Sequence, residues 1–239
     1  MSREEELRRI ANFYNREEWR EQSTTKYSFF DEGNLYLYQA RDRAIIRTLR
    51  ANGIQSLNDK KILEVGCGRG AELNNFVRYG APSINLYGVD LMDYRIADAI
   101  SNNPGINFAC GDASELQFEG GTFDITVQIM AFTSIIDNEL KKKIALEMIR
   151  CTKPGGLILW VDFLLTNPFK RDQNVKAISK KEIHNLFQGH NIRLTRSVLT
   201  RPAVKLIAPY SIIACELLEK LSIFNSFYIG AIKLAHRNK

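Results

Sequence analysis

The chain has 239 residues, of which 45% are hydrophobic, and a formal net charge of +6 at pH 7. This composition supports a sizeable core in one α/β domain with an extension, and no internal repeat or low-complexity stretch is present. The four cysteines form no Cys-x-x-Cys pair, so they indicate the reduced thiols of a cytosolic protein without a zinc site.

The N-terminal part is predicted to be helical. Apolar residues at helical spacing predict one helix over residues 4–22 and another over 36–51, joined by a polar and aromatic loop at 23–33. We expect residues 1–52 to form a helical cap and residues 53–239 to form the main domain. The charged first residues predict no signal peptide, and no apolar run is long enough to cross a bilayer.

A glycine-rich turn follows the first predicted strand. The apolar run at 61–65 contains Glu64 and ends in three alternating glycines, and residues 71–79 have helical spacing. A strand, a glycine turn and a helix place backbone N–H groups and a positive helix end beside a ligand. The glycine spacing differs from that of the dinucleotide fingerprint, which disfavours an NAD oxidoreductase. The three glycines are Gly66, Gly68 and Gly70.

Further strands are predicted in order along the chain. The strand at 84–89 ends in Asp90, and the strand at 106–110 is followed by Gly111 and Asp112. A fourth strand is predicted at 122–128, and the turn at 153–156 leads into a fifth strand at 157–163. A carboxylate at the tip of the second strand of a doubly wound sheet is placed to accept two ribose hydroxyls.

The last third is predicted to complete the sheet. Ser179 and Glu182 form a capping box that opens a helix to about residue 188, and strands are predicted at 191–200 and 227–234. Between these strands, residues 203–221 are apolar around much of a helix, which usually means burial against the sheet or another subunit. The alternative is shallow docking at a membrane interface, helped by the basic residues nearby.

This order of motifs resembles the class I S-adenosylmethionine (SAM)-dependent methyltransferases. The resemblance implies a Rossmann-like, doubly wound seven-stranded sheet with an antiparallel seventh strand, SAM as the cofactor, and no metal. It implies that Glu64 and the glycines shape the cofactor loop, that Asp90 holds the ribose, and that Asp112 meets the adenine. Helix capping for Asp90 and a turn role for Asp112 remain alternatives. The cofactor-binding residues expected from the resemblance are Glu64, Gly66, Cys67, Gly68, Gly70, Asp90, Leu91, Asp112, Ala113 and Gln128.

Segments such as 132–135, 159–163 and 206–209 resemble a narrower set of bacterial methyltransferases found with polysaccharide or secondary-metabolite biosynthesis. The resemblance implies a small-molecule or sugar-bearing acceptor, with O-methylation favoured, in a cytoplasmic enzyme. It also implies that the N-terminal cap folds over the cofactor, with Tyr14, Tyr27 and Tyr38 as candidates to border the pocket or to pack within the cap.

The catalytic base is not evident from the motifs. Asp162 is polar within the apolar fifth strand, so we expect it either to act near the acceptor or to form a salt bridge. Asp137 and Gln128 are lesser candidates, and His184, His190 and His236 are poorly placed. Methyl transfer is an in-line displacement, so the protein mainly aligns the acceptor and removes its proton.

Charge is distributed unevenly. Residues 166–239 carry 13 Lys and Arg against 4 Asp and Glu, whereas residues 1–165 carry 20 against 23. A positive surface attracts an anionic substrate, a phospholipid surface or nucleic acid, and a solvated basic face is the alternative. Nucleic acid is disfavoured, because the fourth strand is followed by Ile129-Met130-Ala131 and not by the aromatic motif that holds a flipped base.

An RNA or protein methyltransferase and a non-catalytic SAM-binding subunit remain the alternatives. The sequence leaves the oligomeric state open.

Overall fold

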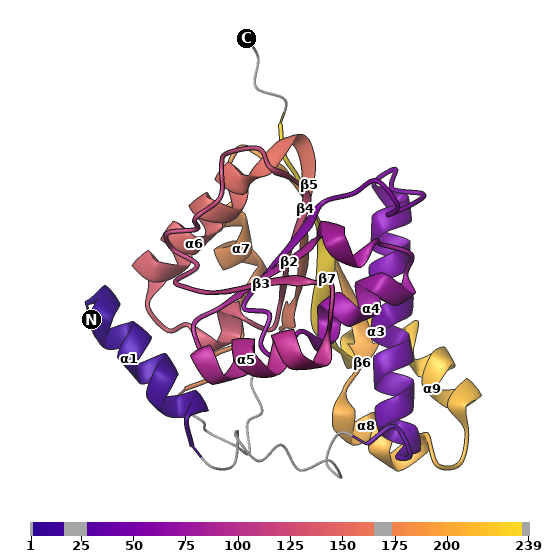
Figure 1. Cartoon of the computed structure of the whole chain (residues 1–239). Helices are drawn as coiled ribbons and strands as arrows, with labels where there is room; N and C mark the ends of the chain where they lie inside the picture. The colour runs from indigo at the N-terminus through magenta and orange to yellow at the C-terminus, as the bar shows by residue number, and fades with distance from the viewer. Residues whose placement is uncertain (1, 17–27, 165–173, 236–239) are drawn as a thin grey trace.

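The computed structural model describes residues 2–16, 28–164 and 174–235. A seven-stranded sheet crosses the molecule in the order β3-β2-β1-β4-β5-β7-β6 (Figure 1). Strand β7 is antiparallel to both of its neighbours, and the other neighbouring pairs are parallel. The predicted doubly wound sheet with an antiparallel seventh strand is confirmed. The strands are β1 Ile62–Val65, β2 Leu86–Asp90, β3 Asn107–Cys110, β4 Phe123–Ile129, β5 Thr152–Phe163, β6 Asn191–Leu199 and β7 Asn225–Lys233.

The central strands are buried on both faces, as expected where helices cover a parallel sheet. All four residues of β1 are buried, and its register sets Glu64 opposite Gly88 of β2 and Val127 of β4. The carboxyl ends of β1, β2 and β4 therefore lie next to one another. This edge of the sheet is where open α/β folds bind their ligands.

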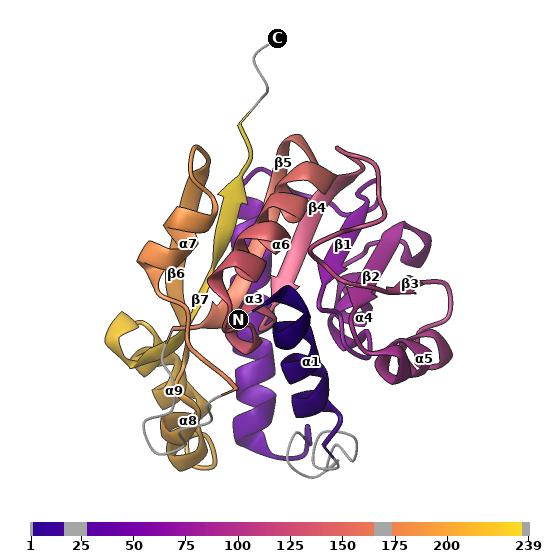
Figure 2. The same ribbon diagram turned by 90° about the vertical axis from the view of Figure 1, so that its left-hand side faces the viewer.

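Helices cover both faces of the sheet (Figures 1 and 2). One hydrophobic cluster joins one face of the sheet to α3, α4, α5, α8 and α9, and a second joins the other face to α6 and α7. Helix α1 adds Leu7 and Ile10 to the edge of the second cluster. The helices are α1 Arg3–Tyr14, α3 Glu32–Ala51, α4 Ala71–Arg78, α5 Asp93–Asn102, α6 Asn138–Cys151, α7 Lys180–Leu186, α8 Arg201–Ile207 and α9 Ile212–Glu219.

The N-terminal helices have different bounds from those predicted. Helix α1 ends at Tyr14, where Asn15 is its C-cap, so the predicted helix is wrong at residues 15 and 16, and its remainder, 17–22, lies outside the described residues. Helix α3 begins at Glu32, four residues earlier than predicted, because the Asp31 side chain accepts a hydrogen bond from the Asn34 N–H and caps it. Hydrophobic spacing located both helices, whereas the capping residues set their ends.

The predicted apolar helix at 203–221 is two short helices, α8 and α9, with a break at 208–211. Pro209 lies at this break, and Ser211 caps α9 by accepting from the Ala214 N–H. The predicted burial is correct for one side only: Val204, Ala208 and Cys215 are buried, but much of the outer side is exposed.

Two smaller expectations at turns and caps need correction. The residues at 153–156 are not a separate turn but belong to β5, whose register shifts between Phe123 and Ile125 of β4. Ser179 caps α7 as predicted, but the helix ends at Leu186, before the predicted residue 188. The Glu182 carboxylate forms an ion pair with buried Lys141, with an N–O distance of 2.6 Å. The Glu182 side chain is therefore directed at Lys141 of α6 and does not complete the predicted capping box with Ser179.

Candidate functional site

A large cavity opens at the carboxyl ends of the parallel strands. Its volume is about 950 Å³, near the upper end of the usual range for ligand pockets. It has two halves, which we name by their linings. The cofactor half is lined by the glycine turn and by the loops after β2, β3 and β4. The acceptor half is lined by α3 and by residues from β5 onward. The cofactor half includes Gly66, Cys67, Gly68, Asp90, Leu91, Asp112, Ala113 and Met130, and the acceptor half includes Phe29, Leu37, Tyr38, Phe163, Val198, Arg201 and Phe227.

The glycine turn between β1 and α4 requires glycine at each predicted position. Gly66, Gly68 and Gly70 have φ values of 74°, 53° and 78°, which side chains rarely adopt. A Cβ on Gly66 would lie 2.7 Å from the Ala131 Cβ, and one on Gly70 would lie 2.6 Å from the Phe108 ring. A Cβ on Gly68 meets nothing nearer than 3.9 Å. Gly68 therefore leaves space for a ligand, whereas the other two permit close packing of the turn.

Asp90 lies at the tip of β2 and is oriented by the glycine turn. Its Oδ2 accepts a hydrogen bond of 2.9 Å from the Gly68 N–H, and its Oδ1 accepts one of 3.0 Å from the Met92 N–H. Each carboxylate oxygen keeps further acceptor capacity toward the cavity that Asp90 lines. The helix-capping alternative fails in its simple form, because the N-cap of α5 is Met92 and no side chain caps it.

Asp112 lines the cavity as predicted, but it has an unforeseen partner. Its Oδ1 accepts from the Ser114 N–H at 2.8 Å, which is the turn role, while Oδ2 accepts from the Arg3 guanidinium at 2.6 Å and 2.8 Å. Arg3 also binds Glu115. The two carboxylates raise the pKa of Arg3 above its ordinary value. The first residues of the chain thus reach the adenine end of the expected site.

Glu64 and Gln128 lie behind the cavity wall and not on it. Gln128 is buried in β4, where its Oε1 accepts from the Ala131 N–H and its Nε2 donates to the Val161 carbonyl. Glu64 is buried, and its Oε2 has no hydrogen-bond partner. Desolvation and the nearby Glu72 carboxylate hold the pKa of Glu64 well above its usual range, although Arg41 opposes them.

Asp162 is fully buried near the end of β5 and does not line the cavity. Its Oδ2 accepts from the Thr133 N–H at 3.2 Å, and its Oδ1 accepts from the Phe163 N–H at 2.9 Å. Burial raises the pKa of Asp162 to about 7, although these hydrogen bonds favour the ionised form. The carboxylate fixes the loop after β4, and Met130, Ala131, Thr133 and Ser134 of this loop face the cavity.

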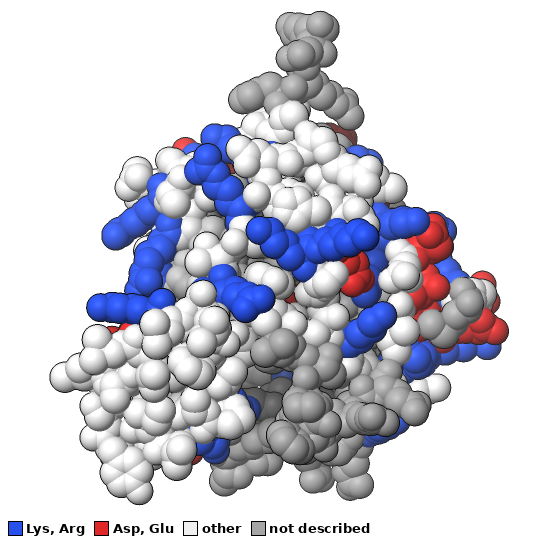
Figure 3. Space-filling model, turned by 180° about the vertical axis from the view of Figure 1, so that it is seen from behind, with Lys and Arg blue, Asp and Glu red and all other residues white. Residues whose placement is uncertain are grey.

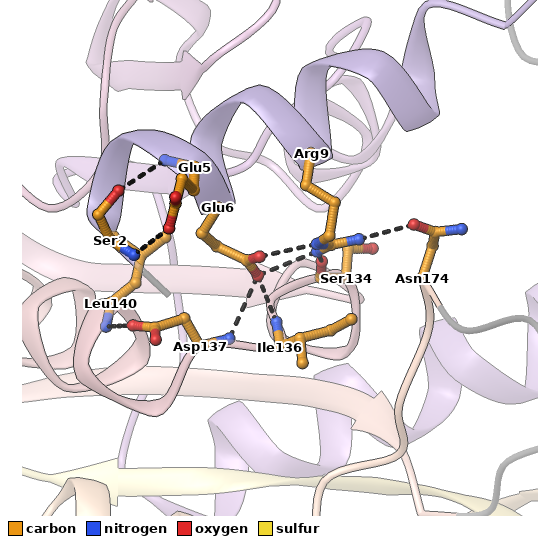
Figure 4. Close-up of polar contacts among 9 residues, drawn as sticks. All are labelled: Ser2, Glu5, Glu6, Arg9, Ser134, Ile136, Asp137, Leu140 and Asn174. Atoms are coloured by element: carbon orange, nitrogen blue, oxygen red, sulfur yellow. Dashed lines mark hydrogen bonds and ion pairs between the residues drawn. The ribbon is translucent and has the colours of Figure 1, made fainter.

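Helix α1 closes the cofactor half through a polar network (Figure 4). The buried Glu6 carboxylate accepts from the N–H groups of Ile136 and Asp137 at 2.5 Å and 3.2 Å, and it pairs with Arg9. Arg9 donates in turn to the Ser134 carbonyl and to Asn174. Burial alone would raise the pKa of Glu6, but Arg9 and the two N–H groups outweigh it, so the pKa lies below its ordinary value.

Tyr14, at the end of α1, borders the cavity as one of the three predicted tyrosines. Its hydroxyl is 2.5 Å from the Ser134 hydroxyl, and Arg95 lies 4.1 Å from its ring centroid. Tyr38 also lines the cavity and stacks on Phe29, with 4.7 Å between centroids. Tyr27 lies outside the described residues. Tyr14 and Tyr38 therefore both line the cavity and pack against another aromatic ring.

The cavity is also lined by residues that the motifs do not reveal. Val198 and Met130 have φ values of 63° and 59°, which are uncommon for residues other than glycine, and both line the cavity. Such strain persists only where the surroundings impose it, and it is frequent at functional sites. Arg201, at the start of α8, donates to Asn34 of α3 at 2.8 Å. No periodicity or spacing in the sequence joins these segments.

Other predicted candidates lie away from this cavity. Asp137 caps α6 by accepting from the Leu140 N–H at 2.7 Å, and neither His184 nor His190 lines the cavity. His236 lies outside the described residues. Among residues 2–16, 28–164 and 174–235, no group of three His, Cys, Asp or Glu side chains is arranged to hold a metal ion.

The residues present fit the cofactor that the motifs imply. Gly68 leaves open space beside the cavity, and Asp90 offers two carboxylate oxygens there. Arg41 lines the cavity, where its Nη2 donates to the Glu72 carboxylate at 2.5 Å, and the other N–H groups of its guanidinium can receive the carboxylate of a methionine moiety. Asp112 and the neighbouring Gly111 and Ala113 line the cavity at the end where the adenine is expected. The site is therefore suited to an adenosyl group at one end and an amino acid at the other.

Comparison with known proteins supports the same identity. Residues 62–156 match the family of the methyltransferase domain. Phthiotriol/phenolphthiotriol dimycocerosates methyltransferase 1 of Mycobacterium ulcerans is 32% identical over 46% of this chain and 40% of that protein. Demethylmenaquinone methyltransferase of Renibacterium salmoninarum is 27% identical over 49% and 47%. The chain thus matches less than half of the length of these curated relatives.

Solved structures share the fold. A putative sarcosine dimethylglycine methyltransferase from Galdieria sulphuraria superposes with a TM-score of 0.60, at 15% identity, over 82% of this chain and 85% of that chain. At this identity the likeness concerns the fold alone. Residues 62–156 therefore form a methyltransferase domain, and the strand order and the glycine turn with Asp90 are those of the class I SAM-dependent methyltransferase fold.

Proposed function

We propose that the chain transfers a methyl group from SAM to a small organic acceptor with a large apolar part. The observation that carries this proposal is that one cavity joins the cofactor half to an apolar acceptor half. The volume of about 950 Å³ leaves room for an acceptor beside a nucleoside-sized cofactor. The two curated relatives are named for organic acceptors, phthiotriol or phenolphthiotriol dimycocerosates in one case and demethylmenaquinone in the other. These names support an organic acceptor of this kind.

The lining of the acceptor half supports oxygen as the favoured acceptor atom. Leu37, Phe163 and Phe227 supply apolar surface, while Arg201 brings positive charge to the same half of the cavity. A cation within a few ångströms favours the ionised form of an acidic hydroxyl or a carboxyl group. Because no histidine is among the described lining residues, an acceptor that ionises readily suits the site better than a sugar hydroxyl.

When bound, SAM supplies an electrophilic methyl group on its sulfonium. The chain supplies alignment: Asp90 holds the ribose, the glycine turn lies against the ligand, and Arg41 receives the carboxylate. Leu7, Ile10 and Tyr14 of α1 line the cavity and exclude water from its cofactor half. In-line geometry between donor and acceptor then depends on the loop after β4, which lies between the two halves.

We propose that Asp162 acts on catalysis by positioning this loop. It lies behind the cavity wall, and both of its oxygens accept backbone N–H groups. The sequence led us to expect direct contact between Asp162 and the acceptor. That contact stays a prediction, and the position of Asp162 behind the cavity wall does not support it. A positioning role is expected to change the alignment of the acceptor and the pH profile, and to leave the cofactor contacts intact.

The sugar-bearing acceptor and the alternatives of RNA or protein are less well supported. The acceptor half is largely apolar, whereas nucleic acid needs a basic and aromatic surface leading to the site. Location in the cytoplasm also remains a proposal. The structure contains, in its described part, no helix that is long and apolar enough to span a bilayer.

The proposal is tested with SAM carrying a deuterated methyl group. The protein is incubated with this SAM and with separate solvent-soluble, RNA and protein fractions from the encoding organism, and products are identified by mass spectrometry. We expect the label in a solvent-soluble compound of low molecular weight, and none in the same incubation with an Asp90→Ala variant.

Label in RNA or in protein would contradict the small-molecule proposal and favour the corresponding alternative. SAM binding without label in any fraction would favour a non-catalytic SAM-binding subunit. Label on nitrogen or carbon of a small molecule would keep the acceptor class and overturn the preference for oxygen.

A further inference from the structure

The helices α8 and α9 and the short 3-10 helix Ser222–Phe224 form a lobe beyond the edge of the sheet, here named the α8–α9 lobe (Figure 1). Its outer surface is apolar. Leu206, Tyr210, Ile213 and Ile223 are exposed by 72%, 88%, 70% and 71%, and Leu217 lies among them at 58%. Figure 3 shows this lobe as a broad surface with few charged side chains. Contiguous apolar surface of this kind marks an interaction site, because single exposed apolar residues are ordinary.

Elsewhere in the described chain, apart from the adjacent Phe29 and Phe30, the most exposed apolar residues lie on separate elements. Ile84 lies beside β2, Ile100 is on α5, and Leu146 is on α6. The concentration on two successive short helices and the turn after them is therefore specific to the lobe. Each of these helices also has an inner side: Val204 of α8 and Cys215 of α9 are fully buried in the core. The lobe is thus a packed element with an unpartnered outer face.

Basic side chains border the apolar face (Figure 3). Lys205 and Lys220 are exposed on the lobe, where Lys205 lies 3.5 Å from the Asp31 carboxylate, and Arg193 and Arg196 are exposed on β6, against which α9 packs. The one exposed acid of α9, Glu216, lies 3.7 Å from Arg43 in an ion pair. An apolar centre with a positive border is complementary to an anionic lipid surface, which takes up apolar side chains and attracts Lys and Arg.

A second copy of the chain is a poorer occupant of this face. A two-fold dimer brings the same patch of both copies together, so the basic borders would face each other and repel. Anionic phospholipid headgroups would instead attract these basic borders. Charge complementarity therefore selects the lipid surface over self-association.

Two exposed aromatic residues link the lobe to the cavity mouth. Phe29 lines the cavity and is 58% exposed, and the adjacent Phe30 is fully exposed. Phe30 shares a small depression with Lys205 and Pro209 of the lobe, which Asp31, Glu32 and Gly33 also line. A membrane that contacts the α8–α9 lobe would therefore also lie next to the opening of the acceptor half.

We infer that the α8–α9 lobe docks the protein on an anionic phospholipid surface, with the cavity mouth turned toward the bilayer. Apolar acceptors dissolved in lipid would then enter the acceptor half without crossing water. Only this delivery step rests on the proposed function; docking itself is independent of methyl transfer.

The test is sedimentation of the full chain with vesicles. One set contains phosphatidylcholine alone, and the other contains phosphatidylcholine mixed with phosphatidylglycerol. We expect binding to the anionic vesicles that weakens as salt is raised. Ile213→Ser combined with Leu217→Ser should lower the partition coefficient about tenfold or more, because two exposed apolar side chains no longer enter the lipid.

The matched control is Ile84→Ser combined with Ile100→Ser, which changes equally exposed residues at the other edge of the sheet and should bind like the parent. Lys220→Gln should weaken binding about fivefold, whereas Lys143→Gln on α6 should not. Thermal unfolding checks that each variant is folded, and SAM binding is measured in parallel. Because this readout is separate, lipid binding by a chain that fails to bind SAM would overturn the proposed function and leave docking supported.

Three results would overturn the inference: no sedimentation with either vesicle, an equal loss in the control pair, or equal binding to the neutral vesicles. A dimer in analytical ultracentrifugation that Ile213→Ser and Leu217→Ser convert to monomer would also overturn it, because a second copy would then be the occupant. A monomer that binds only anionic vesicles would support it.

Discussion

The two halves of the cavity are built from different parts of the chain. The cofactor half comes mainly from the ends of β1, β2 and β3 and the loops that follow them, within residues 62–113, and the loop after β4 and α1 complete it. The acceptor half combines α3 with residues 163, 198, 201 and 227. The first is set by backbone geometry and carboxylates, the second by apolar side chains and arginines. The cofactor is thus expected to contact mainly residues that are close together in the sequence, and the acceptor is expected to contact residues that are far apart in it.

The loop after β4 joins these halves, and Asp162 beneath it gives the largest expected effect. Its folded-state pKa of about 7 lies above the ordinary value, so the neutral carboxyl stabilises the fold at low pH, and this contribution is lost as the pH rises toward about 7. Asp162→Asn stays neutral. The stability of the parent relative to this variant should therefore fall by about 1.4 kcal/mol per pH unit between about pH 4 and about pH 7.

Denaturant unfolding of both proteins across that pH range measures this effect. Asp93→Asn, at an exposed position on α5, is the control and should show no such slope. A constant stability difference between parent and Asp162→Asn would mean that the buried carboxylate stays ionised throughout, which would contradict the account of this loop.

The cofactor half is tested by Asp90→Ala. The loss of charge-assisted hydrogen bonds to the ribose should weaken SAM binding by about 2–3 kcal/mol, measured by calorimetry. Asp93→Ala, three residues along the same segment and exposed, should bind like the parent. Unchanged affinity in Asp90→Ala would separate Asp90 from the cofactor and reduce its role to orienting Gly68 and Met92.

The acceptor half is tested by Arg201→Gln. Because Arg201 lines that half and donates to Asn34, we expect turnover of the identified acceptor to fall about tenfold while SAM affinity stays within a factor of about two. Arg193→Gln, exposed on β6, serves as the control. If SAM affinity fell together with turnover, the two halves would not be separable as described.

The smallest expected effect concerns the closure of the cofactor half by α1. Glu6→Gln removes the charge that binds Arg9 and two backbone N–H groups, and it should weaken the docking of α1 by about 1–2 kcal/mol. Amide hydrogen exchange over residues 3–14 should accelerate accordingly, whereas the exposed Glu4→Gln variant should exchange like the parent.

The same network has a defined pH dependence. Since the folded-state pKa of Glu6 is lowered, its contribution is present above the ordinary glutamate pKa and is lost as the pH falls through the folded-state value. Slow exchange in α1 that persists unchanged in Glu6→Gln would show that Leu7 and Ile10 hold the helix without the carboxylate.

The difference between the halves also explains what the sequence could predict. The strands along the chain, the glycine turn, Asp90 and Asp112 follow from local patterns, because adjacent strand ends meet at one edge of a parallel sheet, whereas the arrangement of the sheet was implied by the family resemblance. Arg3 reaches Asp112 across 109 positions, and Val198 owes its strained backbone to tertiary packing. The break between α8 and α9 depended on Pro209 and the Ser211 cap, which hydrophobic spacing alone does not weigh.

Calorimetric titration with SAM and with its demethylated product tests the central claim most directly. The account predicts one site per chain with dissociation constants in the micromolar range, and a loss of both affinities in Asp90→Ala. Absence of SAM binding by the folded parent, especially together with tight binding of NAD, would contradict it.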